Sequence, residues 1–494
     1  MRNFVHVILW GEEIGSLMWH TERHNSYFVY NPAYMSKEEE PFPLVAPKTN
    51  TAINTYHGED KRIYQHLPAF IADSLPDDWG NVLFEQWLSD NDLSDSEITP
   101  LDKLIFIGKR GMGALEFEPD MSPLPYKEPV NVGELAGLAH QIFVERENAR
   151  ILPNEMLTKQ LLISVGTSAG GRQPKAIIAI NRVTGEIRSG QIAGMDDYDY
   201  YILKFGDSNR NSAELEMTYY QMATEAGIEM MPSRLLEAAG EKHFLTQRFD
   251  RIGGEKLHLQ TLAAMDPDAN SYEKLLLVCR RLHLPDSSAD EVFRRMVFNY
   301  LANNTDDHSK NFSFLMNRDG EWKLSPAYDM TYIFNSGGFL PETEHCLLMQ
   351  GKYKRWTKEN ILHFAEKYGV NEPIKIVRRV VDALTQFRKI AEQNNVKQEW
   401  IGRIEYTINE HLQEWGFATN HKMEEWKSED GRQVADIYLE QAYKGNIHLY
   451  ATISGKQKRY VFRPSAPEYQ LIVEQGINNI TITQLREWIE KYML

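Results

Sequence analysis

Cysteine is scarce in this sequence. Only Cys279 and Cys346 occur among 494 residues, and neither lies in a CxxC pair or near a histidine at the spacing of zinc ligands. We therefore expect both to be reduced thiols in the core, and we expect no zinc site.

Long apolar runs and low-complexity stretches are also missing. The N-terminal segment from Phe4 to Trp10 is interrupted by His6, and no later segment reaches membrane-spanning length without interruption. The composition, with 42% hydrophobic and 25% charged residues, is typical of a globular protein. The sequence therefore predicts a cytoplasmic chain that is folded nearly throughout and makes no contact with a membrane.

Positive charge is in deficit. Lysine and arginine number 54 against 70 aspartates and glutamates, which gives a formal net charge of −16. A field of this sign repels the phosphate backbone of nucleic acids unless a local basic patch overrides it. We therefore do not expect this chain to bind DNA directly.

Length alone favours about three domains of roughly 150 residues each. The hydrophobic pattern divides the chain more finely, into four segments. Residues 1–128 form a β-rich subdomain that ends in a proline-rich stretch, 129–252 contain strands and a Gly-rich loop, 253–419 are mainly helical, and 420–494 form a small α+β extension of unknown role. The predicted fold class is α+β.

Local signals mark several elements inside these segments. Near the start, residues 5–9 alternate between apolar and polar positions as in a strand. Helical spacing between residues 67 and 88 is broken by Pro76, which predicts two helices with an elbow. The helix expected at 289–303 is predicted to begin with a capping box of Ser288 and Glu291, and the last helix to be capped by Thr483.

A Gly-rich stretch lies between residues 165 and 175, just ahead of a predicted strand. It contains Ser168, Ala169, Gly170 and Gly171, whose small side chains let the backbone approach a ligand closely. This stretch is a candidate phosphate-binding loop.

Three polar residues carry the strongest chemical signal. Asp306 and Asn311 are five positions apart, which is the spacing of the protein-kinase catalytic loop, where the Asp accepts the substrate hydroxyl proton and the Asn binds Mg²⁺. A predicted hairpin then leads to Asp329, whose carboxylate is expected to be a second Mg²⁺ ligand. Asp and Asn are also common in turns and caps, but the order of elements favours a metal and base site.

Upstream residues match the same interpretation. Lys204 ends a strand that follows the Gly-rich loop, where a kinase places the lysine that holds the α- and β-phosphates of ATP. Glu216, in the next helix, is placed to pair with Lys204. The stretch from Gln247 to Phe249 would be the hinge that offers backbone groups to adenine, and Asp250 with Arg251 is expected to be a structural ion pair.

Motifs in separate segments resemble those of the HipA family, in the family's order. They are Ser168-x-x-Gly171-x-Gln173-x-Lys175, Arg248-Phe249-Asp250-Arg251, Thr305-Asp306-x-His308-x-Lys310-Asn311-Phe312-Ser313 and Pro326-x-Tyr328-Asp329. The segments Leu75-Pro76-Asp77 and 107–114 resemble the family's N-terminal unit. The similarity extends over about residues 1–415, and its spread over several segments makes coincidence remote.

The resemblance implies a HipA-like two-lobed fold of the protein-kinase type, with ATP and Mg²⁺ as cofactors and with His308 and Lys310 among the ATP-binding residues. HipA proteins are serine/threonine kinases of toxin-antitoxin pairs. They phosphorylate an aminoacyl-tRNA synthetase, stall translation and arrest growth, the state that underlies persistence. A HipB-like helix-turn-helix antitoxin holds them, so contact with DNA is indirect. By the same resemblance, Ser168 is the autophosphorylation site.

Two residues depart from the family's pattern. Asp307 replaces an expected glycine, which puts a second carboxylate beside the proposed base, and Gln247 stands where a glutamate is usual. Two other functions remain open from the residues alone. One is a small-molecule phosphotransferase of the aminoglycoside-kinase type, and the other is an inactive scaffold that only binds an antitoxin.

Overall fold

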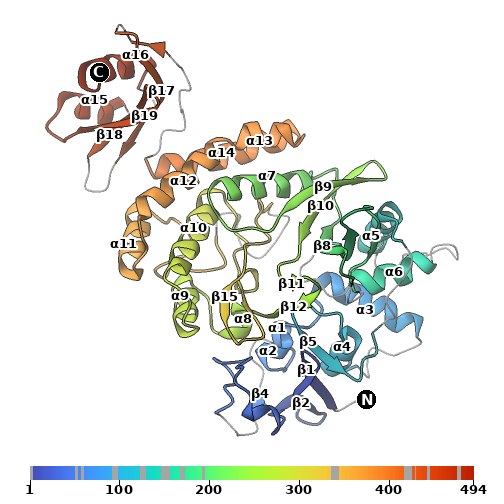
Figure 1. The fold of residues 1–494 in the computed structure, drawn as a ribbon. Coiled ribbons are helices and arrows are strands. Elements are labelled where there is room, and N and C mark those ends of the chain that lie inside the picture. The colour runs from blue at the N-terminus through green and yellow to red at the C-terminus, as the bar shows by residue number, and fades with distance from the viewer. Residues whose placement is uncertain are drawn as a thin grey trace. The chain divides into compact units, whose positions relative to one another are not determined.

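The computed structural model in Figure 1 describes residues 4–49, 54–56, 61–91, 98–122, 129–145, 156–166, 173–191, 195–334, 344–416, 426–428, 430–441, 446–475 and 480–494. The chain divides into two compact units. The first comprises residues 1–220, 229–288 and 307–331, and the second comprises 221–228, 289–306 and 332–494. Each unit is described by itself, and the four segments expected from the sequence stay a prediction.

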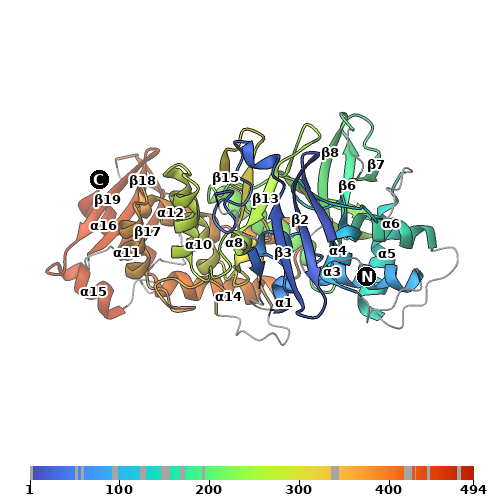
Figure 2. The same ribbon diagram turned by 90° about the horizontal axis from the view of Figure 1, so that it is seen from below.

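The first unit opens with a five-stranded antiparallel sheet in the order β4-β3-β2-β1-β5. Its strands are β1 (Phe4–Leu9), β2 (Glu12–His20), β3 (Asn25–Tyr30), β4 (Asn54–Tyr56) and β5 (Leu115–Glu118). Figure 2 shows β1, β2 and β3 side by side. Val5, Val7 and Leu9 are all buried, which confirms the alternation predicted for this stretch.

Four short helices belong to the same N-terminal part: α1 (Lys61–Tyr64), α2 (Ala69–Ala72), α3 (Asp78–Asp90) and α4 (Pro100–Ile107). Pro76 lies between α2 and α3, so the predicted elbow is confirmed. Thr99 and Asp102 form a reciprocal capping box at the start of α4.

A second five-stranded sheet follows, in the order β7-β6-β8-β10-β9. Its strands are β6 (Lys175–Asn181), β7 (Ile187–Ser189), β8 (Tyr198–Lys204), β9 (Ser233–Ala238) and β10 (Glu241–Gln247). Helices α3, α5 (Val132–Glu145) and α6 (Met156–Gly166) share one apolar core with this sheet. The hairpin between β9 and β10 turns at Ala239 and Gly240, which both have positive φ angles, as a two-residue hairpin loop requires.

The remaining elements of the first unit bring distant segments of the chain together. They are α7 (Ser212–Glu225, which continues into the second unit), β11 (Arg251–Ile252), β12 (Glu255–Lys256), β13 (His258–Thr261), α8 (Leu262–Met265), α9 (Tyr272–Arg281), β14 (Ser313–Met316) and β15 (Trp322–Leu324). A three-stranded sheet, β13-β14-β15, pairs the segment after the catalytic loop with β13. The turn at Gly320, with a φ of 79°, leads the chain back toward Asp329 as predicted.

The second unit is mainly helical up to residue 416. Its helices are α10 (Ser287–Leu301), α11 (Lys358–Tyr368), α12 (Pro373–Thr385), α13 (Phe387–Gln393) and α14 (Gln398–Glu414). The predicted capping box at the start of α10 is wrong. Ser288 already lies inside the helix, and the carboxylate of Glu291 accepts hydrogen bonds from Arg294 at 2.6 Å and Arg295 at 2.8 Å instead.

The C-terminal residues contribute a small α+β subdomain to the second unit. Strands β16 (Trp426–Lys427), β17 (Gln433–Gln441), β18 (Ile447–Ile453) and β19 (Lys456–Phe462) form an antiparallel sheet, with helices α15 (Pro467–Gln475) and α16 (Ile482–Tyr492). They share one apolar core of their own. The cap of the last helix is Thr481, not Thr483 as predicted, because Thr481 forms a capping box with Gln484.

Two expectations from composition can be compared with the fold. Within the described residues, no helix is both long enough and apolar enough to cross a membrane. Both cysteines are free thiols. Cys279 is buried as predicted, whereas Cys346 is half-buried, so the expectation of a core position is right for Cys279 alone.

A buried ionic cluster joins the N-terminal sheet to the rest of the first unit. Asp250 is fully buried and accepts hydrogen bonds from Arg248 at 2.8 Å and from Arg251 at 2.7 Å, which confirms the predicted structural pair. Its carboxylate also accepts from the backbone N–H of Gly113 at 2.6 Å. A Cβ atom at Gly113 would lie 2.9 Å from Leu259, and the φ of 73° is also strained for other residues, so glycine is required there.

Replacing Asp250 with Ala should therefore destabilise the first unit strongly. Two buried arginines would keep their charges without the carboxylate, and removing one partner of a buried ion pair costs about 3–5 kcal/mol. Urea unfolding followed by tryptophan fluorescence measures the change. The exposed Asp319 is a matched control, for which we expect a change within about 0.5 kcal/mol. Equal stability of the two variants would contradict the assignment.

Candidate active site

The candidate site is built around one buried lysine. Lys204 is the last residue of β8, and the residue is 7% exposed. The Nζ atom of Lys204 donates hydrogen bonds to Glu216 on α7 and to Asp329, which follows β15. The lysine–glutamate pair predicted from the sequence is thus confirmed, and Asp329 joins it as a third charged partner.

The charges of this cluster depend on one another. Burial acts to lower the pKa of Lys204, but the carboxylates of Asp329 and Glu216 outweigh it and raise that pKa. Burial acts to raise the pKa of Asp329, but Lys204 and Lys175 outweigh it and hold that pKa at about 2. For Glu216, burial and the neighbouring Asp329 outweigh the lysines, so its pKa is raised.

Lys175 is a member of the cluster to which the sequence interpretation gave no role. It begins β6 directly opposite Lys204, and it is 3% exposed. Burial lowers the pKa of Lys175, although the carboxylate of Asp329 acts to raise it. The missed signal was the pairing of the two strands, since a lysine at the start of one strand lies across from a lysine at the end of the other.

The loop predicted to be catalytic contains two adjacent carboxylates with different surroundings. Asp307, the unexpected residue, is 1% exposed and accepts a hydrogen bond from Tyr272 Oη at 2.6 Å. Asp306 is exposed. Asp307 therefore anchors the loop in the first unit, and the choice of Asp306 as the base, made from its spacing to Asn311, stays a prediction.

Tyr328 holds the two candidate metal ligands in neighbouring segments. Its hydroxyl donates to the carbonyl oxygen of Lys310 at 2.7 Å. Asn311 follows Lys310 in the chain and Asp329 follows Tyr328, so this one bond ties their segments together. The ring of Tyr328 also lies 5.5 Å from that of Phe249, a residue predicted to contact ATP.

The donor set of this region fits Mg²⁺. A carboxylate from Asp329 and an amide oxygen from Asn311 are hard oxygen ligands, and Mg²⁺ is usually held by one or two such groups together with phosphates and waters. Asp329 has a φ of 52°, a conformation that is uncommon for residues other than glycine and that is found at functional sites. Within the described part of the chain, no group of three or more His, Cys, Asp and Glu residues could hold a metal on its own.

The central residues of the Gly-rich loop, Ser168, Ala169, Gly170 and Gly171, lie outside the described residues. Both flanks of the loop are anchored. Arg110 donates to the carbonyl oxygens of Ile163 and Ser164 near the end of α6, at 3.2 Å and 3.0 Å. After the loop, Gln173 donates to the carbonyl oxygen of Phe205 at 2.9 Å.

The backbone of the predicted hinge is partly occupied. The N–H of Gln247 donates to Pro232 and that of Arg248 to Tyr200, at 3.0 Å and 2.9 Å. Adenine recognition by this stretch would therefore use groups other than these two amides, and the hinge stays a prediction.

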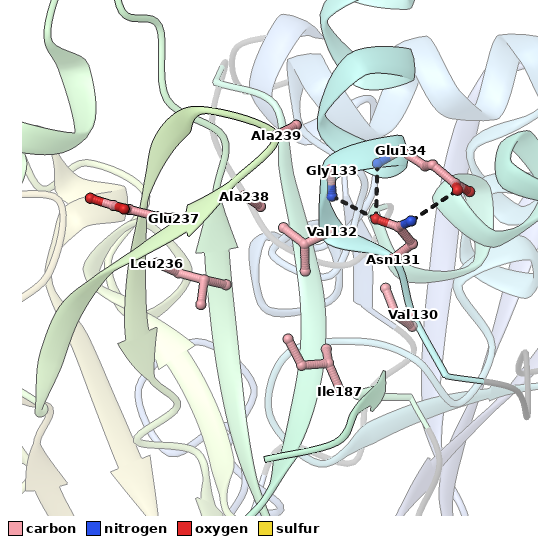
Figure 3. A pocket seen from close by; sticks show the side chains of 10 residues that line it. All are labelled: Val130, Asn131, Val132, Gly133, Glu134, Ile187, Leu236, Glu237, Ala238 and Ala239. Atoms are coloured by element: carbon pink, nitrogen blue, oxygen red, sulfur yellow. Dashed lines mark hydrogen bonds between the residues drawn. The ribbon is translucent and has the colours of Figure 1, made fainter.

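A hollow lined by both edge strands of the second sheet, β7 and β9, and by the start of α5 is separate from this site. Figure 3 shows its lining: Val130, Asn131, Val132, Gly133, Glu134, Ile187, Leu236, Glu237, Ala238 and Ala239. The side chain of Asn131 caps the start of α5 by accepting from the N–H groups of Gly133 and Glu134. The hollow shares no residue with the cluster around Lys204.

Comparison with known proteins identifies one family. The family model described as HipA N-terminal domain matches residues 5–118, and that described as HipA-like C-terminal domain matches residues 167–389. Among solved structures, HipA of Shewanella oneidensis MR-1, in a complex with HipB and its operator DNA, superposes with a TM-score of 0.57 at 16% identity. That superposition covers 83% of this chain and 97% of that one.

Two curated relatives cover smaller parts of the chain. A protein of Haemophilus influenzae named "Putative kinase" is 27% identical over 290 residues, which are 50% of this chain and 82% of the relative. The "Putative kinase Y4dM" of Sinorhizobium fredii is 27% identical over 192 residues, 36% of this chain and 46% of that relative.

Fold and ionic cluster together define an α+β protein of the kinase type. With both of the family's domains matched in their order along the sequence, the chain belongs to the HipA family.

The ionisation of Asp329 should affect how the free energy of unfolding depends on pH. Its pKa is near 2 in the folded chain against an ordinary value of 3.8, so its ionisation stabilises the fold above about pH 4, and this contribution is lost as the pH falls toward 2. The stability difference between wild type and Asp329→Asn should therefore shrink over that interval. Urea unfolding at several pH values measures it.

The control for this comparison is Asp319→Asn, in the exposed turn before β15. Its difference from wild type should be small at every pH. An Asp329→Asn difference that stays constant or grows on acidification would show that the carboxylate is not held ionised by the lysines.

Proposed function

We propose that this chain is a Mg-ATP-dependent serine/threonine protein kinase and the toxin of a toxin-antitoxin pair. The observation that carries the proposal is the buried cluster in which Lys204 contacts both Glu216 and Asp329. Protein kinases use a strand lysine paired with a helix glutamate, together with a metal-binding aspartate, for phosphoryl transfer. Family membership favours the same chemistry.

In this proposal the chain's residues position ATP and neutralise its charge. Lys204, oriented by Glu216, holds the α- and β-phosphates, and the buried Lys175 across the strand adds a second cation. Asp329 and Asn311 would hold Mg²⁺, which when bound neutralises the charge on the β- and γ-phosphates. Lys204 exchanges its contact with Asp329 for the phosphates as the nucleotide enters.

Asp306 is the proposed base. Its exposed side chain is accessible to a serine or threonine hydroxyl of a protein, whose proton it accepts as the γ-phosphate is transferred. Asp307 is not a candidate for this role, because its carboxylate is buried. It stabilises the loop by accepting a hydrogen bond from Tyr272.

We propose an aminoacyl-tRNA synthetase as the substrate, so that its phosphorylation inhibits translation and arrests growth. This substrate class rests on the family's known activity. A HipB-like helix-turn-helix antitoxin is the proposed partner, and the HipA of Shewanella oneidensis was solved with HipB and operator DNA. The net charge of −16 favours contact with DNA through such a partner only.

The two other functions have less support. A small-molecule phosphotransferase would have no need of the HipA N-terminal domain that residues 5–118 match. An inactive scaffold would have no need to bury two lysines beside two carboxylates, an arrangement that costs desolvation free energy.

Replacing either of the two proposed catalytic carboxylates should impair phosphoryl transfer, but for different reasons. Asp306→Asn should lower kcat for phosphorylation of a protein substrate by roughly 10²–10⁴-fold, the usual contribution of a general base, while Mg-ATP still binds. Asp329→Asn should also weaken nucleotide binding, and only when Mg²⁺ is present. Radiolabel transfer and calorimetric titration measure the two effects. Asp319→Asn is the control, and unchanged kcat in both catalytic variants would refute the proposal.

Ser168 is proposed as the site of self-inactivation. A phosphate adds about −1.5 to −2 charge, which would repel the phosphates of ATP from the Gly-rich loop. Because the loop belongs to the same chain as the base, transfer should occur between molecules, with a rate that rises with protein concentration. Ser168→Ala should keep ATP binding and lose most self-labelling, whereas Ser168→Asp should impair both. Mass spectrometry that finds phosphate only at other residues of an active sample would exclude this mechanism.

A further inference from the structure

Residues 73–79, which form the turn after α2 and the first two residues of α3, contact the proposed nucleotide site at two points. Asp77 accepts a hydrogen bond from Lys310 Nζ at 2.9 Å, although 233 residues separate them in the sequence. Two positions further on, Trp79 is fully buried, and its Nε1 donates to the carbonyl oxygen of Lys175 at 3.0 Å. One short turn of the N-terminal domain thus holds a lysine of the catalytic loop and the start of β6.

The carboxylate of Asp77 is not used as its position in the helix predicts. Asp77 is the N-cap residue of α3, where an aspartate usually accepts from the first amides of the helix. Its side chain makes no such cap bond. The carboxylate accepts a hydrogen bond from Lys310 instead, so it joins two distant segments of the chain.

Lys310 is fixed at both of its ends. Its carbonyl oxygen accepts from Tyr328, the residue before Asp329, and its ammonium group is held by Asp77. The neighbouring Asp73 is held by Thr261, whose N–H and hydroxyl donate to it at 2.8 Å and 2.7 Å. Burial acts to lower the pKa of Lys310, but Asp77 and Asp73 outweigh it and raise that pKa, so the ammonium form is secured.

We infer that Asp77 is a positioning residue of the kinase site, which orients the ammonium group of Lys310 toward the phosphates of ATP. The inference rests on the proposed function, and it makes the N-terminal domain a working part of the nucleotide site. A cation that is aimed before the nucleotide arrives requires no reorganisation at the moment of transfer. In this role Asp77 contacts neither ATP nor substrate, and it acts through its hydrogen bond with Lys310.

A mutant cycle tests this role with Mg-ATP as the probe. The variants are Asp77→Asn, Lys310→Ala, their double mutant, Asp77→Glu as the conservative variant, and Asp78→Asn as the control. The control removes the same charge from the first turn of α3 and leaves the contact between Asp77 and Lys310 in place. Calorimetry gives the dissociation constant, a coupled assay gives kcat, and thermal melts monitor the fold.

We expect Asp77→Asn to weaken Mg-ATP binding by about 10-fold, the lower end of the effect of removing a residue that supports a ligand-contacting group. Asp78→Asn should stay near wild type, and Asp77→Glu should recover much of the affinity. In the Lys310→Ala background, Asp77→Asn should have no further effect.

Three results would overturn the inference: wild-type affinity in Asp77→Asn, an equal loss in Asp78→Asn, or an undiminished loss when Lys310 is already alanine. A wild-type chain that binds Mg-ATP but transfers no phosphate would refute the proposed function, and the binding cycle would still decide the role of Asp77. A wild-type chain that does not bind Mg-ATP would overturn both.

Discussion

The stability of the first unit depends on the burial of one charged lysine, Lys204. Lys204 is tolerable at 7% exposure only because the carboxylates of Glu216 and Asp329 face it. Glu216 is buried as well, whereas Asp329 is partly exposed. The partners come from β8, α7, the segment after β15 and the start of β6. No one of these elements can move without leaving a charge uncompensated, so the electrostatic constraint fixes the relative positions of four distant segments.

Three further hydrogen bonds hold the segments next to this cluster. Tyr328 ties the catalytic loop to the segment of Asp329, Tyr272 anchors the loop through Asp307, and Asp77 reaches it from the N-terminal domain. Each contact joins segments that are far apart in the sequence. The chain uses single hydrogen bonds, rather than a long regular element, to set the geometry of the site.

The fold class and the pairing of Lys204 with Glu216 could be predicted because their signals are local, while the roles of Asp306 and Asn311 stay predictions. Alternation in β1, Pro76 between two helices, and the spacing of Asp306 and Asn311 are each readable over a few residues. Lys175 could not be assigned, because its role comes from the pairing of β6 with β8. Ser288 and Thr483 were wrong as caps because several residues near a helix start can cap it, and tertiary packing selects one. The role of Asp307 could not be predicted either, because it depends on a hydrogen bond with Tyr272, which lies 35 residues earlier in the chain.

The order of residues in the first unit also affects how the protein is made. Lys204 and Asp329 are 125 positions apart, and the unit is completed only by residues 307–331. At about 5–20 residues per second, the ribosome needs roughly 6–25 s to add the missing carboxylate after the lysine has been synthesised. A nascent chain therefore carries an incomplete charge cluster while about a quarter of its residues are added. A polypeptide released before residue 329 lacks the third member of the charge cluster, so about two-thirds of the chain must be synthesised before the cluster can form.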